Sequence, residues 1–320
     1  MKINIIGGSG FIGTRLGELL EAEGHDDFRI VDKQPSARFG SRCTIADVRS
    51  VEALRQAIEP GSYIVNLAAE HQDNVLPVEL YEEVNVHGAR NICTVARENG
   101  VNAILFTSSV AVYGNAEVGA DETTPFRPFN EYGRTKAAAE EVFRAWHAED
   151  PQCRTLVIVR PTVVFGEGNR GNVFNLLRQI HSRRFLMIGR GRNFKSMAYV
   201  GNVAAFLRHC LQLRPGLHVS NYVDKPDFST RELVCFIRRC MGMASDAAMA
   251  LPFPLALALG SGIDIVAKLT NRQFPISALR IHKFCSNSSF STNASALGFK
   301  APYPLREALR LTIASEFPAQ

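Results

Sequence analysis

A glycine-rich segment near the N-terminus limits the folds open to this chain more than any other feature. The apolar run Lys2–Ile6 has the composition of a buried strand, and three glycines spaced three residues apart follow it directly. There the first glycine permits a tight turn, the second leaves room for a pyrophosphate, and the third lets a helix pack closely on the strand. The free N–H groups of that helix favour an anion. The segment therefore predicts a dinucleotide-binding loop, with contacts from Gly7, Gly10, Phe11, Ile12 and Gly13.

Strand-like and helix-like segments alternate through the first half of the chain. The predicted strands are Lys2–Ile6, Phe28–Val31, Tyr63–Leu67, Ala103–Thr107 and Thr155–Val159. The predicted helices are Thr14–Glu23, Val51–Ile58, Val78–Asn99 and Thr135–His147, and Leu217–Val223 is expected to rejoin the sheet. Such alternation is typical of a parallel sheet with helices on both faces. We expect an α/β fold with a doubly wound Rossmann sheet of six or seven strands. The Rossmann domain is expected to comprise residues 1–165 plus about 197–224. Residues from about 166–196 and 225–320 are expected to form a smaller C-terminal substrate-binding lobe.

Composition and charge exclude several classes of protein. A chain of 320 residues with 46% hydrophobic and 21% charged residues is globular rather than disordered. The net charge of +5 is a mild excess, and the arginines are scattered along the sequence, so we expect small anionic ligands and no nucleic acid. The seven cysteines form no CxxC pair and no Cys/His metal spacing, which predicts buried thiols, a reducing compartment and no metal.

Cellular location depends on two segments. The N-terminus opens on a strand-like run without signal-peptide architecture, so we expect a cytoplasmic protein. The apolar segment Leu251–Leu269 is interrupted by Gly260, Gly262, Asp264 and Lys268. We therefore predict a buried or surface-packed helix and no stable membrane insertion. A peripheral membrane contact is the alternative.

Carboxylates after the second and third strands indicate how the adenosine half of a dinucleotide is held. Asp32 ends the second strand, where a carboxylate accepts hydrogen bonds from ribose hydroxyls and repels a 2′-phosphate, so NAD is favoured over NADP. Lys33, also predicted to contact the cofactor, and Arg38 weaken this inference because either side chain pairs readily with a 2′-phosphate. Asp47 and Val48 are placed to reach the adenine edge.

A serine, a tyrosine and a lysine carry the predicted chemistry. Tyr132 and Lys136 are four residues apart on a predicted helix and share one face. A phenol is a poor base at neutral pH, but a nearby ammonium and a positive nicotinamide ring lower its pKa. Ser109 is placed to donate a hydrogen bond to the same oxygen or to the substrate. Alone, the Tyr-x-x-x-Lys spacing also fits a surface tyrosine beside a solvated lysine.

Several motifs in order give the chain a family resemblance. They are Gly7-x-x-Gly10-x-x-Gly13, Asn66-Leu-Ala-Ala69, Thr107-Ser-Ser109, Tyr113-Gly114, Tyr132-Gly-x-Thr-Lys136 and Arg160-Pro161. The chain thus resembles the extended short-chain dehydrogenase/reductase family, in particular NAD-dependent sugar-nucleotide epimerases and reductases related to UDP-galactose 4-epimerase. The resemblance implies that Ser109, Tyr132 and Lys136 are catalytic. It also implies cofactor contacts from Leu67, Ala68, Ala69, Asn85, Thr107, Tyr132, Lys136 and Pro161.

The resemblance also implies residues that bind substrate. Besides Ser109, these are Asn172 and Lys195, both assigned to the substrate diphosphate. Lys195 stands where the family usually has an arginine, so it supplies a point charge without a bidentate fork. Ser109-Val110 replaces the acidic pair of the 4,6-dehydratases, which argues against dehydration.

We therefore expect an NAD-dependent epimerase that oxidises and re-reduces a ring hydroxyl of a nucleoside-diphosphate sugar, at C4 in the simplest case. The alternative is an NAD(P)H-dependent 4-ketoreductase of a 4-keto-6-deoxy sugar nucleotide in surface polysaccharide synthesis. A non-catalytic dinucleotide sensor is disfavoured because Tyr132 and Lys136 are both present. By family analogy we expect a homodimer.

Overall fold

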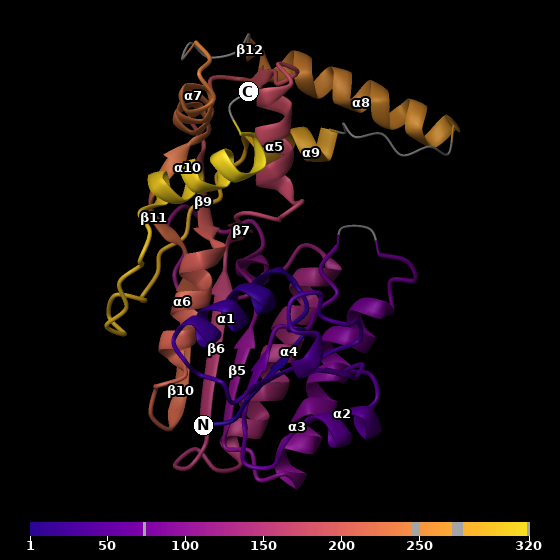
Figure 1. The fold of residues 1–320 in the computed structure, drawn as a ribbon. Coiled ribbons are helices and arrows are strands. Elements are labelled where there is room, and N and C mark those ends of the chain that lie inside the picture. Colours follow the sequence, from indigo (N-terminus) through magenta and orange to yellow (C-terminus); the bar gives the residue numbers. More distant parts are fainter. Residues whose placement is uncertain (73–74, 245–249, 271–277, 319–320) are drawn as a thin grey trace. The chain divides into compact units, whose positions relative to one another are not determined.

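The computed structural model describes residues 1–72, 75–244, 250–270 and 278–318. The chain divides into two compact units (Figure 1). Unit 1 comprises Met1–Val164, Ala198–Asp224 and Phe290–Pro304, and unit 2 comprises Phe165–Met197, Lys225–Ser289 and Leu305–Gln320. The predicted lobe 225–320 is therefore not continuous, because Phe290–Pro304 returns to unit 1. Thr292 and Asn293 hold it there through hydrogen bonds to strand β10.

Unit 1 contains a parallel seven-stranded sheet in the order β10-β6-β5-β4-β1-β2-β3. Its strands are β1 (Ile3–Ile6), β2 (Phe28–Asp32), β3 (Cys43–Ile45), β4 (Tyr63–Asn66), β5 (Ala103–Thr107), β6 (Thr155–Pro161) and β10 (Gly216–Tyr222). The predicted doubly wound sheet is confirmed, and β10 does rejoin it. Strand β1 pairs with β2 on one side and β4 on the other, so the strand order reverses there. In sheets of this type, ligands bind at the carboxyl ends of the strands beside such a reversal.

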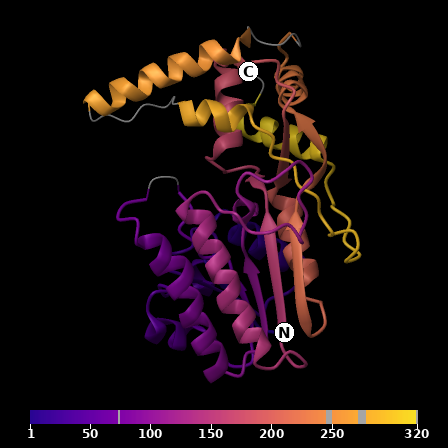
Figure 2. The same cartoon turned by 180° about the vertical axis from the view of Figure 1, so that it is seen from behind.

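Helices cover both faces of this sheet (Figure 2). One core packs β1 and β6 against α1 (Phe11–Ala22) and α6 (Val200–Cys210). The other packs the opposite face against α2 (Val51–Ala57), α3 (Gly88–Glu98) and α4 (Glu131–Ala148). Strands β1, β4 and β6 are buried along their whole length, which explains why they appear in the sequence as continuous apolar runs.

Three predicted helix boundaries differ from the structure. Helix α1 begins at Phe11 rather than Thr14, and α4 begins at Glu131 rather than Thr135. The predicted helix Val78–Asn99 is two elements, the π-helix η2 (Glu82–His87) and α3. In both α1 and α4 the sequence around the helix start is rich in glycine or polar residues. Cap geometry, rather than apolar periodicity, therefore decides where each helix begins.

Unit 2 is built mainly from helices around short strands. Its helices are α5 (Asn172–His181), α7 (Thr230–Cys240), α8 (Phe253–Thr270), α9 (Ala278–Cys285) and α10 (Leu305–Glu316). Unit 2 contains a sheet that pairs β12 with β8. A further three-stranded sheet has the order β11-β9-β7, and each of its strands includes residues of both unit ranges. These strands are β7 (Val163–Phe165), β8 (Met187–Ile188), β9 (Phe194–Tyr199), β11 (Asp224–Ser229) and β12 (Ala250–Leu251). A capping box formed by Ser229 and Glu232 starts α7.

Two further predictions concern cysteines and the apolar segment. Cys93 and Cys210 are buried as expected, but Cys153 is exposed. Among the described residues, no three His, Cys, Asp or Glu side chains are grouped as metal ligands. The segment Leu251–Leu269 is helical only from Phe253, where α8 begins, and α8 packs on α9. No helix in the described part of the chain is both long and apolar enough to cross a bilayer.

Candidate functional site

The glycine loop between β1 and α1 has the shape of a pyrophosphate cradle. Gly7 has φ +75°, and a Cβ added there would lie 2.5 Å from the backbone nitrogen of Ala68. A Cβ on Gly13 would lie 2.5 Å from the Cα of Gly8, so helix α1 can approach the loop only without a side chain. At Gly10, by contrast, an added Cβ would meet the Gly7 carbonyl oxygen at 3.3 Å and no other described atom within 4 Å beyond its chain neighbours. The chain itself would therefore tolerate a side chain at Gly10. The space that its absence leaves is open to a ligand.

The helix that follows this loop presents its N-terminus to the same space. Gly10 is the extended N-cap of α1, and the first turn starts with Phe11, Ile12 and Gly13. The first N–H groups of a helix have no partner within the helix, and they carry the positive end of its dipole. A dinucleotide pyrophosphate therefore fits this loop both in shape and in charge.

Asp32 lies beside the glycine loop. One carboxylate oxygen accepts a hydrogen bond from the Ser9 N–H at 3.0 Å, and the other accepts from the Gln34 N–H at 3.1 Å. The two nearby cations differ in availability, because Arg38 pairs with Glu21 whereas Lys33 is exposed. The pairing of Arg38 removes one of the two side chains that weakened the inference for NAD.

Asp47 and Val48 follow strand β3. The carboxylate of Asp47 is 2.8 Å from a guanidinium nitrogen of Arg49, and hydrogen bonds from Arg49 hold the pKa of Asp47 below its ordinary value. Val48 is buried against the start of α3, where a Cβ on Gly88 would lie 2.8 Å from a Val48 methyl group. Contact of these two residues with an adenine remains a prediction.

The segment after β4 is held by Asn85. Its amide nitrogen donates to the Glu70 carbonyl at 3.1 Å and to Thr135 Oγ1 at 2.9 Å, and its amide oxygen accepts from the Glu70 N–H at 2.9 Å. Asn85 thus ties the chain after Leu67, Ala68 and Ala69 to helix α4. These contacts indicate that Asn85 positions the segment that follows β4.

The structure places Ser109, Tyr132 and Lys136 around the end of strand β5. Helix α4 approaches the turn η3 (Val110–Tyr113) so closely that a Cβ on Gly133 would lie 2.5 Å from the Ala111 carbonyl oxygen. This approach brings the Tyr132 hydroxyl into a hydrogen bond with Ser109. Lys136 is buried, and its Nζ donates to the Thr107 carbonyl at 2.8 Å.

In the chain without NAD, burial has the largest effect on the pKa values of Tyr132 and Lys136. Burial raises the pKa of Tyr132, and the hydrogen bond with Ser109 offsets this only in part. Burial also lowers the pKa of Lys136 to about 7, so its positive charge near neutral pH is incomplete. The chain alone therefore does not make Tyr132 a stronger base.

Three buried hydroxyl groups lie at the ends of β5 and β6. The sequence predicts a cofactor contact for Thr107 but assigns no role to Ser108 or Thr162. The side-chain oxygens of Thr107, Ser108 and Thr162 have no hydrogen-bond partner among the described residues. Thr107 ends β5, Ser108 follows it, and Thr162 follows Pro161 at the end of the adjacent β6. Buried hydroxyls usually have partners, so three orphaned ones at neighbouring strand ends indicate where a bound group lies. A hydroxyl residue directly after a predicted strand, such as Ser108, is a sequence feature from which such a group could be predicted.

Arg160 belongs to a buried network of polar side chains that the sequence does not predict. Arg160 pairs with Glu140 on α4 and donates to the Tyr113 hydroxyl at 2.6 Å. Tyr113 in turn donates to the Asn221 side chain at 2.7 Å. The sequence signals Arg160 only as part of a motif and provides no sign of its partners.

The two residues assigned to the substrate diphosphate lie in unit 2. Asn172 is exposed at the first turn of α5. Lys195 lies on β9 and donates to the carbonyl oxygens of Ser286 at 2.7 Å and Lys283 at 3.0 Å. Burial lowers the pKa of Lys195. Both diphosphate contacts remain predictions.

Comparison with known proteins agrees with this site. The sequence model of the NAD-dependent epimerase/dehydratase family matches residues 3–223. An N-acetyl-α-D-glucosaminyl-diphospho-ditrans,octacis-undecaprenol 4-epimerase of Escherichia coli O157:H7 is 46% identical over 99% of this chain and 95% of its own. A decarboxylating sterol-4-α-carboxylate 3-dehydrogenase of Candida albicans is 30% identical over 98% of this chain and 96% of its own. The structure of the Thermus thermophilus UDP-glucose 4-epimerase with NAD superposes with a TM-score of 0.76 at 22% identity, covering all of both chains.

The chain belongs to the NAD-dependent epimerase/dehydratase family, within the extended short-chain dehydrogenases/reductases. It is an NAD-dependent enzyme, so the predicted cofactor is confirmed. The prediction of an epimerase is likewise supported over the ketoreductase alternative.

Proposed function

We propose that this enzyme is a 4-epimerase of an N-acetylhexosamine that is linked through a diphosphate to a polyprenol. The observation that carries this proposal is the 46% identity to the Escherichia coli enzyme, which extends over 99% of the chain and so includes unit 2. A diphosphate is common to this carrier and to the nucleotide carrier expected from the sequence. The anion-binding roles assigned to Asn172 and Lys195 therefore apply to either one.

The catalytic cluster supports the chemistry. When bound, NAD would supply the hydride acceptor for oxidation of the sugar and the hydride donor for its re-reduction. Tyr132 takes the proton of the ring hydroxyl and later gives it back, while Ser109 holds the phenol oxygen through their hydrogen bond. Lys136, fixed on the Thr107 carbonyl, sets the electrostatic potential along this edge of the site.

Epimerisation requires that the keto sugar stays bound and presents its other face. The hydroxyls of Thr107, Ser108 and Thr162 then provide hydrogen-bond partners for the bound groups. As further parts of the proposal, the enzyme is a cytoplasmic homodimer that acts in surface polysaccharide synthesis.

The test compares two carriers of the same sugar. Purified enzyme is incubated with N-acetylglucosaminyl-diphosphate on a short, water-soluble prenol and, separately, with UDP-N-acetylglucosamine. The sugar is released by mild acid and separated by chromatography. We expect N-acetylgalactosamine from the prenol-linked substrate, with no net change in nicotinamide absorbance. Faster conversion of the UDP-sugar would reject the proposed carrier, and steady consumption of NADH with a 4-keto sugar would reject epimerisation.

A further inference from the structure

Positive charge is concentrated in unit 2. Its residue ranges contain 17 Lys and Arg against 7 Asp and Glu, a net charge of +10, whereas unit 1 contains 19 against 24, a net charge of −5. The two units thus hold similar numbers of basic residues, and the difference in net charge comes from the acidic residues, most of which lie in unit 1. A basic surface attracts anionic partners over roughly one Debye length, about 8–10 Å at physiological salt.

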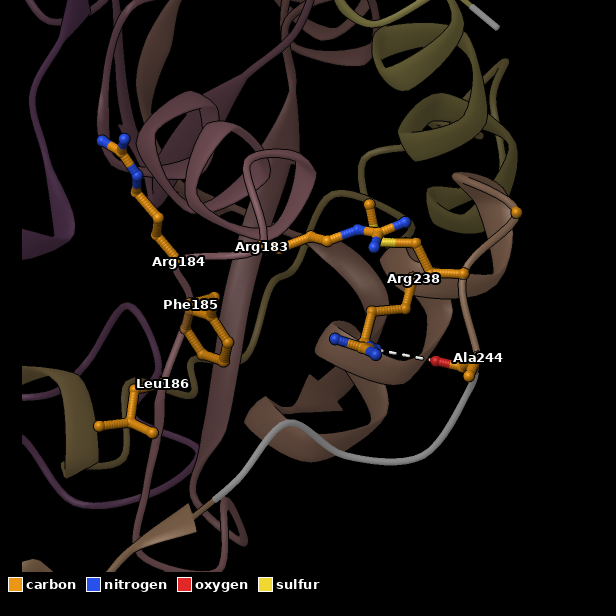
Figure 3. A pocket seen from close by; sticks show the side chains of 8 residues that line it. Arg183, Arg184, Phe185, Leu186, Arg238 and Ala244 are labelled. Carbon is orange, nitrogen blue, oxygen red and sulfur yellow. Dashed lines mark hydrogen bonds between the residues drawn. The ribbon is translucent and has the colours of Figure 1, made fainter.

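Part of this charge surrounds a hollow in unit 2, of about 640 Å³. We call it the arginine hollow and define it by Arg183, Arg184 and Arg238 (Figure 3). In the part of the chain that the structure describes, no carboxylate lies within 4.0 Å of the Arg183 or Arg184 guanidinium. Phe185 and Leu186 line the same hollow, and Leu186 is 43% exposed. The hollow thus combines cations without acidic partners and an exposed apolar side chain.

Helix α8 adds an exposed apolar stripe to the same unit. Leu255, Leu259 and Val266 are 51%, 54% and 47% exposed, and their spacing of four and seven residues places them on one side of the helix. We call these three residues the α8 stripe. The stripe is larger than a singly exposed leucine, and contiguous exposed apolar residues mark interaction sites.

The contact between α8 and α9 uses a different side of α8. Ala256 is buried, and a Cβ on Gly260 would lie 2.7 Å from Ile281 and 3.0 Å from the backbone nitrogen of Ala278. Asp264 accepts a hydrogen bond from the same Ala278 N–H at 3.0 Å. The acidic side chain of α8 is therefore engaged with α9, which leaves the α8 stripe apolar.

The hollow and the stripe are joined within unit 2. Leu186 leads directly into β8, which pairs with β12, and β12 leads into α8. The Phe185 ring of the hollow is 6.2 Å from the ring of Phe284 on α9, the helix on which α8 packs. Figure 1 shows β12 at the start of α8.

We propose that the α8 stripe and the arginine hollow together bind the surface of an anionic phospholipid bilayer. Anionic lipid attracts clustered arginines, and an apolar helix face enters the boundary between headgroups and acyl chains. Because no described helix is able to span a bilayer, α8 lies in the interface rather than across it. The proposal deepens the proposed function, since a polyprenol-linked sugar resides in a membrane, but its test needs no substrate.

The experiment measures co-sedimentation of the full-length, NAD-loaded protein with vesicles. One set contains equal amounts of phosphatidylcholine and phosphatidylglycerol, and the other contains phosphatidylcholine alone. We expect binding to the anionic vesicles at low salt, much weaker binding to the neutral ones, and release at high salt because the charges are screened. Absence of binding to anionic vesicles at low salt would overturn the proposal.

Two variants test the two parts of the surface. Leu255→Glu with Leu259→Glu should lower anionic-vesicle binding at least about tenfold, because two leucines no longer enter the interface. Arg183→Gln with Arg184→Gln should weaken binding to anionic vesicles only. Leu217→Glu places the same charge on a leucine of β10 that is 42% exposed in unit 1, and it should bind like the wild type. NAD affinity and melting temperature identify any variant that fails to fold, and Leu255→Ser with Leu259→Ser then replaces the glutamate pair.

The remaining outcomes distinguish failure of the docking surface from failure of the proposed function. If the glutamate pair binds vesicles as the wild type does, the α8 stripe is not the contact. If the wild type ignores vesicles and the glutamate pair converts a dimer to a monomer in size-exclusion chromatography, the stripe joins two copies and the proposal is overturned. Vesicle binding without epimerisation of the prenol-linked sugar would reject the proposed function alone, and epimerisation without vesicle binding would reject the docking surface alone.

Discussion

Glu140 and Arg160 form a buried bidentate ion pair, in which Arg160 Nε lies 2.8 Å from Glu140 Oε1 and Nη2 lies 2.6 Å from Oε2. Their side chains are 0% and 1% exposed. The pair joins α4, which carries Tyr132 and Lys136, to β6, which ends at Pro161. The position of α4 on the sheet therefore depends on two compensated charges.

Removing one partner of the Glu140–Arg160 pair should destabilise the folded protein. We expect Glu140→Ala to lower the free energy of unfolding by about 3–5 kcal/mol, because it leaves the Arg160 charge buried without compensation. Glu140→Leu combined with Arg160→Met should recover most of this loss, since both charges are then absent. Urea unfolding of the two variants measures the difference, and equal stability of the two would contradict the argument.

Tyr132 is expected to act as the acid and base. Tyr132→Phe retains the ring but removes the proton donor, so kcat should fall by roughly 10²–10⁴-fold. NAD affinity should stay nearly the same. Tyr303→Phe, which alters a partly exposed tyrosine elsewhere in unit 1, is the matched control and should retain activity. Turnover near the wild-type rate in Tyr132→Phe would remove this residue from the mechanism.

Asp32 is expected to set the preference for NAD over NADP. In Asp32→Ala the repulsion of a 2′-phosphate is lost, so the ratio of the two dissociation constants should shift by about tenfold toward NADP. Calorimetric titration of both cofactors gives this ratio. Asp27→Ala, just before the same strand, serves as a control. Equal affinities of the wild-type protein for NAD and NADP would show that Asp32 does not discriminate.

Lys136 should make stability depend on pH. Burial lowers its pKa from 10.5 to about 7, so between these values the unfolded chain binds more protons than the folded one. The free energy of unfolding should therefore rise with pH in this window, by about 2 kcal/mol between pH 7 and 9 from this residue.

The check is the difference between the wild type and Lys136→Met, both free of NAD. Because the other titrating groups are shared, the stability gap between the two proteins should change by this amount from pH 7 to 9. A constant gap would mean that Lys136 keeps an ordinary pKa in the folded protein.

Local patterns made the sheet and the cofactor loop predictable. The strands are buried along their length and followed by amphipathic helices, so apolar runs alone locate β1, β4, β5 and β6. The glycine spacing is equally local. The predicted start of α1 is three residues late because the glycine spacing assigns Phe11-Ile-Gly13 to the cofactor loop, whereas Gly10 is already the N-cap of the helix.

Contacts between distant residues were not predictable in this way. Arg160 and Glu140 are 20 residues apart, and Asn293 reaches Val219 across 74 residues, with no periodicity to announce either contact. The pKa values of Tyr132 and Lys136 in the chain without NAD were not predictable from spacing either. Spacing places both residues on one helix face, but burial and the Thr107 carbonyl decide their electrostatics.

The π-helix η2 makes one stretch of the chain intolerant of length changes. A π-helical turn holds one more residue than an α-helical turn would, and here that turn carries Asn85. Deleting any one residue of Glu82–His87 would let the segment relax to α-helical geometry and rotate what precedes it by about 100°. Asn85 would then lose register with Glu70 and Thr135. A related protein that lacks one residue of the segment corresponding to Glu82–His87 therefore needs other contacts to hold the chain that follows β4.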